Sequence, residues 1–332
     1  MIDMPKTLFN LVLANVSNNI GWLTLNRPDV LNALSLEMTD AIATHLQKWQ
    51  EDSTVRMVVI QGNGRAFCAG GDLRQVYQAL QKQDKKLALR FFNHEYNLNR
   101  IIHNYPKPYI AILNGITMGG GMGLSIHGSH RIVTDNVLLA MPETGIGFFP
   151  DVGASHFLSK CPGEIGLYLG LTGAIIGPAD ALYSKLATHY LSHENLSYFL
   201  DYIAELDSSK AIDTFLNQLP EENIPQTGFL AEQREIIEAC FNQPTLLEIL
   251  KALENHPSNF AQKTLTCLKT RSPLSLKLTF TLLKEAQNLD FHNAINEEFK
   301  LSQEMIKEPD FMEGIRATVI DKDRTPQWLS SL

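Results

Sequence analysis

Short apolar runs alternate with helix-like segments along the first half of the chain. Four of these runs are rich in β-branched residues and bounded by turn-forming residues, which predicts strands at 20–26, 55–63, 108–115 and 130–141. Between the first two runs, Met38, Ile42, Leu46 and Trp49 recur at helical spacing and predict an amphipathic helix. Segment 91–102 has the same character. Alternating strands and helices predict an α/β domain.

The pattern changes near residue 190. Beyond it, helix-like segments follow one another up to about residue 308, at 229–241, 245–254, 275–287 and 294–306. One short strand is expected at 317–321 (ATVID). We therefore predict a core of residues 1–190 and a C-terminal helical region, residues 191–332, that packs on it.

Composition narrows the function classes. The 332 residues carry a net charge of −8 and no basic stripe, which disfavours nucleic acid as a partner. No apolar run is long enough to cross a membrane. The first residues lack the features of a signal or transit peptide, so a cytoplasmic location is expected. The four cysteines are far apart and the histidines lack ligand spacing, so neither a disulfide framework nor a metal site is expected.

Two glycine-rich segments each follow a predicted strand and precede a predicted helix. They read GNGRAFCAGGDL (62–73) and NGITMGGGMGLS (114–125). Glycine permits positive φ and close backbone approach, and the N–H groups at a helix start carry partial positive charge. Either segment alone is better explained as a tight turn. Together they could direct two N–H donors at one oxygen, which is an oxyanion hole.

Two acids, Glu143 and Asp151, occupy the next segment, AMPETGIGFFPDVG (140–153). Each follows a proline, and glycines lie between them, so a compact loop is expected rather than a straight helix. The acids could be helix caps or turn acceptors. The neighbouring Phe148 and Phe149 instead suggest an apolar lining, which would raise the pKa of a carboxyl group and suit it to acid–base chemistry.

Common catalytic motifs are missing from the sequence. GLSIHG (123–128) has its second glycine one residue too late for GxSxG, and there is no GxGxxG after a strand, no HExxH and no Walker A motif. His127 and His130, which flank an expected helix-to-strand junction, are better explained as structural residues.

Four segments, in family order across residues 8–190, resemble the crotonase (enoyl-CoA hydratase/isomerase) superfamily. They are LNRPDVLNALS, RAFCAGGDL, NGITMGGGMGLS and AMPETGIGFFPDVGASHFL. The sequence is most similar to the 3-hydroxyisobutyryl-CoA hydrolase branch, and this resemblance continues through SPLSLKLTFTLLKEA and EGIRATVIDKDRTPQW. It implies an α/β fold, a crotonase-like spiral of ββα repeats with a C-terminal helical extension, and a coenzyme A thioester as the ligand.

The resemblance also assigns roles. Gly71 and Gly120 would supply the two N–H donors of the oxyanion hole, and Glu143 matches a glutamate that hydratases keep. The second catalytic glutamate of hydratases falls at Gly123, which has no side chain, while Asp151 stands where typical hydratases carry glycine. The missing glutamate at position 123 and the additional carboxylate of Asp151 both favour hydrolysis over hydration.

In that branch Glu143 would act as nucleophile or as general base, and Asp151 would orient the substrate or water. Glu95 matches a position that contacts the acyl group, although a solvated helix residue is almost as good an explanation. Arg65 and Lys322 are candidates for binding coenzyme A by position, and each could equally be a surface charge.

The expected function is hydrolysis of a short 3-hydroxyacyl-CoA thioester, most specifically 3-hydroxyisobutyryl-CoA in valine catabolism. No separate cofactor is expected, because coenzyme A is part of the substrate. The first alternative is an enoyl-CoA hydratase or isomerase that uses Glu143 alone. The second is a non-catalytic member of the fold that binds RNA or a protein. The sequence leaves open a trimer, a hexamer or a monomer.

Overall fold

The chain divides into two compact units that are both discontinuous in sequence. The computed structural model describes residues 11–205, 212, 214 and 228–331. Unit 1 comprises Met1–Gly71, Asn97–Leu139 and Ile176–Gly228, and unit 2 comprises Asp72–Tyr96, Ala140–Ile175 and Phe229–Leu332. The division into 1–190 and 191–332 expected from the sequence stays a prediction, and its residues 1–10 and most of 206–227 lie outside the described part.

Unit 1 is built on a six-stranded sheet with the order β1-β2-β3-β5-β7-β9. Its strands are β1 (Val12–Ser17), β2 (Ile20–Leu25), β3 (Met57–Gly62), β5 (Tyr109–Leu113), β7 (His130–Val133) and β9 (His189–Tyr190). β1 and β2 form an antiparallel hairpin, and every later pair in the sheet is parallel. The hairpin turn uses Asn18 and Asn19, both at positive φ, as a two-residue turn of this kind requires.

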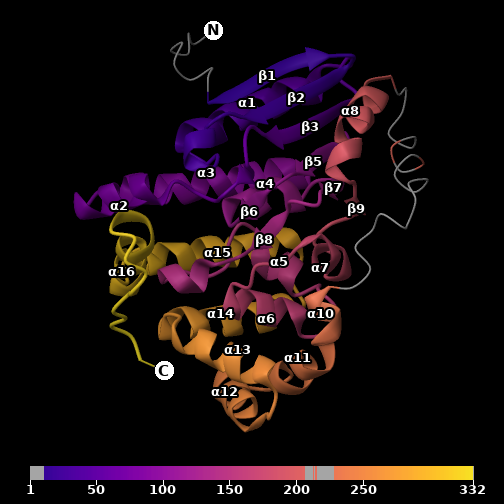
Figure 1. Ribbon diagram of the computed structural model, residues 1–332. Helices are drawn as coiled ribbons and strands as arrows, with labels where there is room; N and C mark the ends of the chain where they lie inside the picture. Colours follow the sequence, from indigo (N-terminus) through magenta and orange to yellow (C-terminus); the bar gives the residue numbers. More distant parts are fainter. Residues whose placement is uncertain (1–10, 206–211, 213, 215–227, 332) are drawn as a thin grey trace. The chain divides into compact units, whose positions relative to one another are not determined.

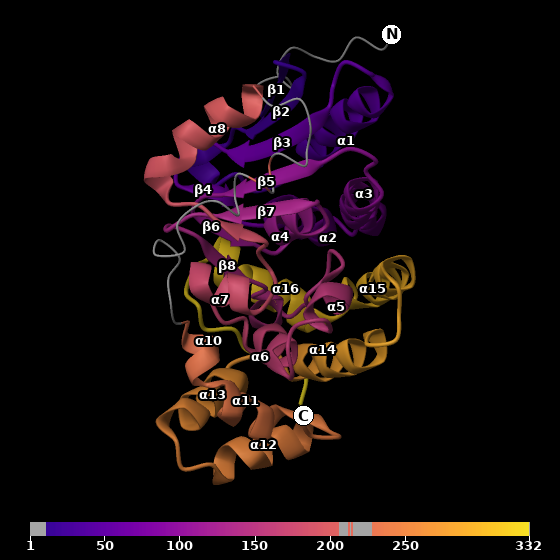
Figure 2. The ribbon, with the colours of Figure 1, turned by 90° about the vertical axis from the view of Figure 1, so that its right-hand side faces the viewer.

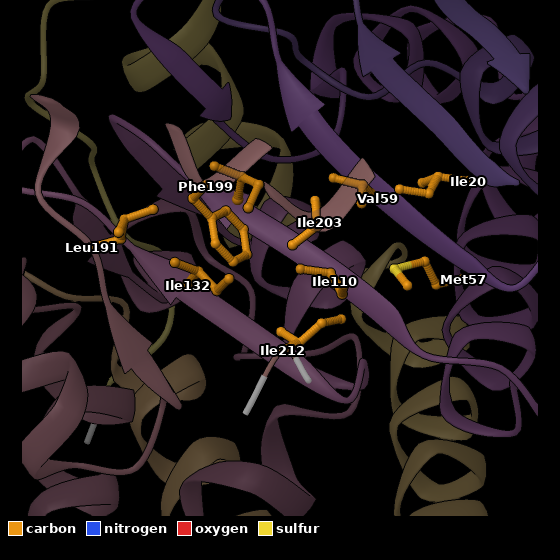
Figure 3. Close-up of a cluster of buried hydrophobic side chains, with 10 residues drawn as sticks. Ile20, Met57, Val59, Ile110, Ile132, Leu191, Phe199, Ile203 and Ile212 are labelled. Carbon is orange, nitrogen blue, oxygen red and sulfur yellow. The ribbon is translucent and has the colours of Figure 1, made fainter. Parts of the chain in front are cut away.

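The two faces of this sheet are covered by different helices. On one face, alternate strand residues such as Ile20, Val59 and Ile110 form an apolar cluster with Phe199 and Ile203 of α8 (Leu196–Glu205), as Figure 3 shows. The opposite face carries α1 (Leu36–Glu51), which lies across the sheet from α8 in Figure 2. Here β2 and α1 approach so closely that a side chain at Gly21 would collide with the Trp49 ring.

A second sheet has three strands. Its strands, in the order β4-β6-β8, are β4 (Ala66–Cys68), β6 (Ile116–Met118) and β8 (Leu138–Ala140). Each directly follows a strand of the larger sheet, and a helix follows it: α2 (Leu73–Gln81), α4 (Gly120–Ile126) and the 3-10 helix η3 (Glu143–Ile146). The chain is therefore a series of ββα repeats, and the predicted α/β fold class is confirmed.

Unit 2 is mainly helical, as the pattern beyond residue 190 predicts (Figure 1). Its further helices are α5 (Ala154–Leu158), α6 (Ile165–Thr172), α10 (Phe229–Glu232), α11 (Arg234–Phe241), α12 (Leu246–Asn255), α13 (Asn259–Lys269), α14 (Pro273–Ala286), α15 (Phe291–Met305) and α16 (Pro309–Ile315). Ser258, Ser272 and Asp290 cap α13, α14 and α15 through side-chain oxygens that accept backbone N–H groups, which sets where each helix begins. No helix in the described part of the chain combines the length and apolarity that spanning a bilayer needs.

Two element predictions are corrected. Segment 130–141 forms two strands rather than one, because the chain turns between them with Val137 N–H donating to the Thr134 carbonyl. Segment 317–321 is not a strand: residues Arg316–Ile320 form a π-helical turn. The Arg316 guanidinium pairs with Glu313, Asp321 and Asp323, and these ion pairs hold the segment in a turn despite its β-branched residues.

The apolar face under α8 should contribute strongly to stability. We expect Phe199→Ala to lower the free energy of unfolding by about 3–5 kcal/mol, because Phe199 is fully buried in the cluster. Urea denaturation followed by circular dichroism measures this. Tyr198→Ala is the matched control, since Tyr198 precedes Phe199 and is 63% exposed. Equal losses in the two variants would contradict the assignment of Phe199 to the core.

Candidate active site

The two glycine-rich segments lie beside each other within unit 1. Gly70 has φ of +105°, and Gly119, the N-cap of α4, has φ of +50°. A Cβ atom at Gly70 would lie 3.3 Å from the Met118 carbonyl oxygen and 3.7 Å from the Gly120 nitrogen. The two turns therefore lie in contact with each other, and their positive φ values favour glycine at both positions.

The proposed donors, Gly71 and Gly120, follow these turns directly. Gly120 is the first residue of α4, so its N–H has no partner within the helix. Gly71 forms an isolated parallel bridge with Leu34, in which the Leu34 N–H donates to the Gly70 carbonyl at 2.8 Å. The role of the two amides as an oxyanion hole stays a prediction.

Helix α4 also fixes the environment of Gly123. A side chain at Gly121 would collide with the Cys68 carbonyl, so α4 lies directly against β4. The Gly123 carbonyl accepts from the buried Asn99 side chain at 3.0 Å. No carboxylate can be offered from position 123, as expected from the sequence.

Unit 2 brings four carboxyl groups together. Glu95 comes from α3 (Lys85–His103), Glu143 from η3, Asp151 from the loop before α5, and Glu298 from α15. Their exposed fractions are 3%, 6%, 6% and 0% respectively. The surface position considered for Glu95 is therefore wrong. The idea that Asp151 caps a helix is also wrong, because the N-cap of α5 is Gly153.

Local geometry accounts for the compact loop that carries Glu143 and Asp151. η3 follows Pro142 and ends at Gly147, which has φ of +71°. A side chain at Gly147 would collide with the Asp310 carbonyl, so only glycine fits there. The chain then turns again at Val152 and Gly153, with φ of +56° and +86°. The predicted loop between the two acids is confirmed.

An aromatic cluster lines this part of unit 2, as Phe148 and Phe149 suggested. The Phe148 ring stacks on the rings of Phe149 and Phe92, with centroids 4.5 Å and 5.2 Å away, and lies 4.8 Å from the ring of Phe311. Such apolar surroundings disfavour the charged form of a carboxyl group.

Asp151 is held by a residue that sequence reasoning missed. The fully buried Tyr96 donates its hydroxyl to Asp151 Oδ2 at 2.8 Å. Burial raises the pKa of Asp151 to about 7, and the hydrogen bond from Tyr96 acts in the opposite direction. Tyr96 directly follows Glu95 on α3, so one helix supplies both a partner for Asp151 and a second buried acid.

Glu143 and Glu95 each keep an oxygen without a partner. Burial raises the pKa of both carboxyl groups well above the usual value, and the charge of Asp151 raises it further. Within the described residues, Glu143 Oε2 and Glu95 Oε1 are buried and make no hydrogen bond. A buried acceptor without a donor is costly, so both oxygens are suited to a ligand that brings donors.

Glu298 is the second residue that sequence reasoning missed. It accepts hydrogen bonds from Gly153 and Ser155, just beyond Asp151. Burial raises its pKa to about 8. Its spacing from the buried Phe291, Ile295 and Met305 places an acid on the apolar side of α15, a signal that the sequence contained.

The remaining candidates, Arg65 and Lys322, are both at the surface. Arg65 is exposed in the β3–β4 connection of unit 1, and Lys322 is exposed after the π-helical turn of unit 2. Their role in binding coenzyme A stays a prediction. Within the described residues, no three side chains among His, Cys, Asp and Glu are arranged to hold a metal ion.

Comparison with known proteins agrees with the repeats and the four sequence segments. A family model described as enoyl-CoA hydratase/isomerase matches residues 20–331. The chain belongs to the enoyl-CoA hydratase/isomerase family. The predicted resemblance to this family is confirmed.

Relatives within the enoyl-CoA hydratase/isomerase family include proteins named 3-hydroxyisobutyryl-CoA hydrolase. The mitochondrial proteins of Danio rerio and Homo sapiens are 41% and 39% identical, each over 96% of this chain and over 85% and 83% of the relative. A probable 3-hydroxyisobutyryl-CoA hydrolase of Arabidopsis thaliana is 38% identical over 96% of this chain and 86% of its own length.

Solved structures within the family carry other names. A carnitinyl-CoA dehydratase from Mycobacterium thermoresistibile has a TM-score of 0.88 and 39% identity, over 96% of this chain and 91% of its own. An enoyl-CoA hydratase from Rhodobacter sphaeroides 2.4.1 has a TM-score of 0.88 and 37% identity, over 96% of this chain and 92% of its own.

The raised pKa of Asp151 predicts a pH-dependent cost to stability. A carboxyl group whose pKa is higher in the folded state binds more protons when folded, so its contribution falls as pH rises between the unfolded and folded values. Relative to Asp151→Asn, the wild-type free energy of unfolding should fall between pH 5 and pH 7 by about 1.4 kcal/mol per pH unit. Urea unfolding of both proteins at several pH values measures the difference. A difference that stays constant over this range would contradict the assignment.

Proposed function

We propose that the protein hydrolyses a short-chain 3-hydroxyacyl-CoA thioester, specifically 3-hydroxyisobutyryl-CoA, to the free hydroxy acid and coenzyme A. The observation that carries the proposal is the burial of Asp151 beside Glu143 and Glu95, with Tyr96 bonded to it. An acid that served only as a turn or cap would lie at the surface. The names of relatives at 38–41% identity support the same substrate.

In the proposed reaction, the Gly71 and Gly120 N–H groups stabilise the thioester oxygen as it becomes negatively charged. Glu143 either attacks the carbonyl carbon, so that water then cleaves a mixed anhydride, or removes a proton from water that attacks directly. In both routes one water is consumed, the carbon–sulfur bond breaks, and the thiolate takes up a proton. Asp151, with its Tyr96 hydrogen bond, orients the water or the substrate.

The hydroxyl group of the acyl chain gives the proposal its substrate class. Glu95 Oε1 is buried and has no partner among the described residues. A 3-hydroxyl group would donate to it and remove the cost of leaving it unsatisfied. An acyl chain without that hydroxyl would leave the oxygen unsatisfied, which would disfavour its binding. Such a hydrolase would serve valine catabolism.

We further propose that the exposed Arg65 and Lys322 contact the phosphates of coenzyme A. Neither residue is needed for the chemistry at the thioester, so replacing them should affect KM more than kcat. The oligomeric state and the cytoplasmic location expected from the sequence stay predictions.

Hydration or isomerisation of an enoyl-CoA is the second candidate function. The names of the two solved structures at 37% and 39% identity favour it. Gly123 opposes a hydratase mechanism that uses two acids around one water, because it offers no carboxylate. An isomerase could work with Glu143 alone, but it would give Asp151 no evident role.

Release of coenzyme A separates these functions. We expect the purified protein to release free thiol from 3-hydroxyisobutyryl-CoA, detected with a thiol-reactive dye, and to do so faster than from isobutyryl-CoA, which lacks the hydroxyl. The difference in rate between these two substrates isolates the contribution of Glu95. Hydration of crotonyl-CoA without thiol release would establish the second candidate instead.

Both acids should be required for turnover. Glu143→Ala and Asp151→Asn are each expected to lower kcat about 10²–10⁴-fold, the usual contribution of a positioned acid–base group. Circular dichroism and thermal unfolding check that the fold persists. Glu235→Gln, on an exposed face of α11, is the control and should keep wild-type activity. Full activity in Asp151→Asn would remove the case for hydrolysis.

A further inference from the structure

Glu298 holds the loop that follows Asp151, although it lies far away in the sequence. Its Oε2 accepts from the Gly153 N–H at 2.6 Å. Its Oε1 accepts from the Ser155 N–H at 2.8 Å and from the Ser155 hydroxyl at 2.5 Å. The carboxyl group is fully buried, so water does not compete for these three bonds. Both of its oxygens are used, which distinguishes Glu298 from Glu95 and Glu143.

The backbone that these bonds hold is in an unfavourable conformation. Val152, a β-branched residue, has φ of +56°, and Gly153 follows at +86°. A β-branched residue in this region persists only where its surroundings enforce it. The bonds from Gly153 and Ser155 to one carboxylate supply such a restraint, because they fix the chain immediately after the strained residue.

The same restraint sets the position of Asp151. Asp151 directly precedes Val152, and its carbonyl accepts from the Ala154 N–H at 2.9 Å, within the turn that Glu298 holds. On its other side, the Tyr96 hydroxyl donates to the Asp151 carboxyl group. Loss of the Glu298 bonds would let the turn relax and would move Asp151 with respect to Tyr96 and Glu143.

Glu298 also adds its charge to the group of acids. The pKa of Glu143 is raised by burial, then by the charge of Asp151, and to a smaller extent by Glu95 and Glu298. Arg271 lies beside η3, 2.9 Å from where a Cβ at Gly145 would stand, and the Asp310 carboxylate is bonded to Ser272 and Ser330. These neighbours of η3 are the same whether or not residue 298 is charged.

We propose that Glu298 is a positioning residue for the thioester hydrolysis described above, holding the strained turn at Val152 and Gly153 so that Asp151 faces its reaction partners. This inference rests on the proposed function. Glu298 does not itself contact the reacting groups, so its removal should affect the chemical step more than substrate binding.

Glu298→Gln is the sharpest test, because the side chain keeps its size and loses one of its two acceptor oxygens. A glutamine has one acceptor oxygen, so either the Gly153 N–H or the Ser155 donors must face its NH₂ group. We expect kcat on 3-hydroxyisobutyryl-CoA to fall at least tenfold while KM changes less than threefold. The acid limb of the kcat/KM pH profile should not move, because a carboxyl group with a pKa of about 8 carries little charge at the pH values of that limb.

Glu297→Gln is the matched control, because Glu297 is the preceding residue of α15 and pairs with Lys300 at the surface. It should match the wild type in kcat and in pH profile. Ser155→Ala removes one of the three donors and retains both acceptor oxygens of Glu298, so it should lower kcat two- to fivefold, less than Glu298→Gln does. If Glu298→Gln does not fold, the kcat and KM of Ser155→Ala still test whether the bonds to Glu298 support turnover.

Two results would overturn the inference. One is a Glu298→Gln protein with wild-type kcat. The other is a loss of activity that only follows the unfolded fraction, measured by circular dichroism, so that kcat per folded molecule matches the wild type. Wild-type protein that releases no coenzyme A from any thioester of an acyl-CoA panel would instead overturn the proposed function itself.

Discussion

Burial of several carboxyl groups in one apolar region is the constraint on which the rest of the candidate site depends. Each charge removed from water is unfavourable, and like charges nearby make it more so, so these groups cannot all be ionised at neutral pH. Their hydrogen-bond partners then separate their roles. Glu298 accepts from three donors and Asp151 accepts from Tyr96, while among the described residues Glu95 and Glu143 each retain a buried oxygen without a hydrogen-bond partner.

The frame around these acids is rigid because it is tightly packed. Gly147 touches the backbone of α16, and Phe148 is stacked between neighbouring rings, so η3 has little freedom to shift. Strained backbone is tolerated next to functional groups when the surrounding structure enforces it. The positive φ of Val152, directly after Asp151, fits that pattern. The strained backbone and the buried carboxyl groups lower the stability of this region, while the packing around them fixes the positions of the acids.

Local pattern predicted much of the fold, and distance along the chain explains what it missed. Strands β2, β3, β5 and β7 of the large sheet follow from apolar runs, whereas β1 and β9 were not predicted. The compact loop at Glu143 follows from its prolines and glycines. Strands β4, β6 and β8 have three residues each, too few to show a period. Tyr96 bonds to a residue 55 positions away, and Glu298 to one 143 positions away. The apolar spacing of α15 marks Glu298 as buried, but no local pattern identifies the partner of Glu298 or of Tyr96. At 317–321, β-branched residues predicted a strand, but the ion pairs of Arg316 outweighed that preference.

The interleaving of the two units has a consequence for any attempt to divide the protein. Because the chain passes between them repeatedly, no single stretch of the gene encodes either one. A fragment ending at residue 190 would lack Leu191, Phe199 and Ile203, and the isoleucines of β2, β5 and β7 would be exposed to water. Sheet surfaces left bare in this way tend to aggregate. Neither unit can therefore be obtained by expressing one continuous segment of the chain.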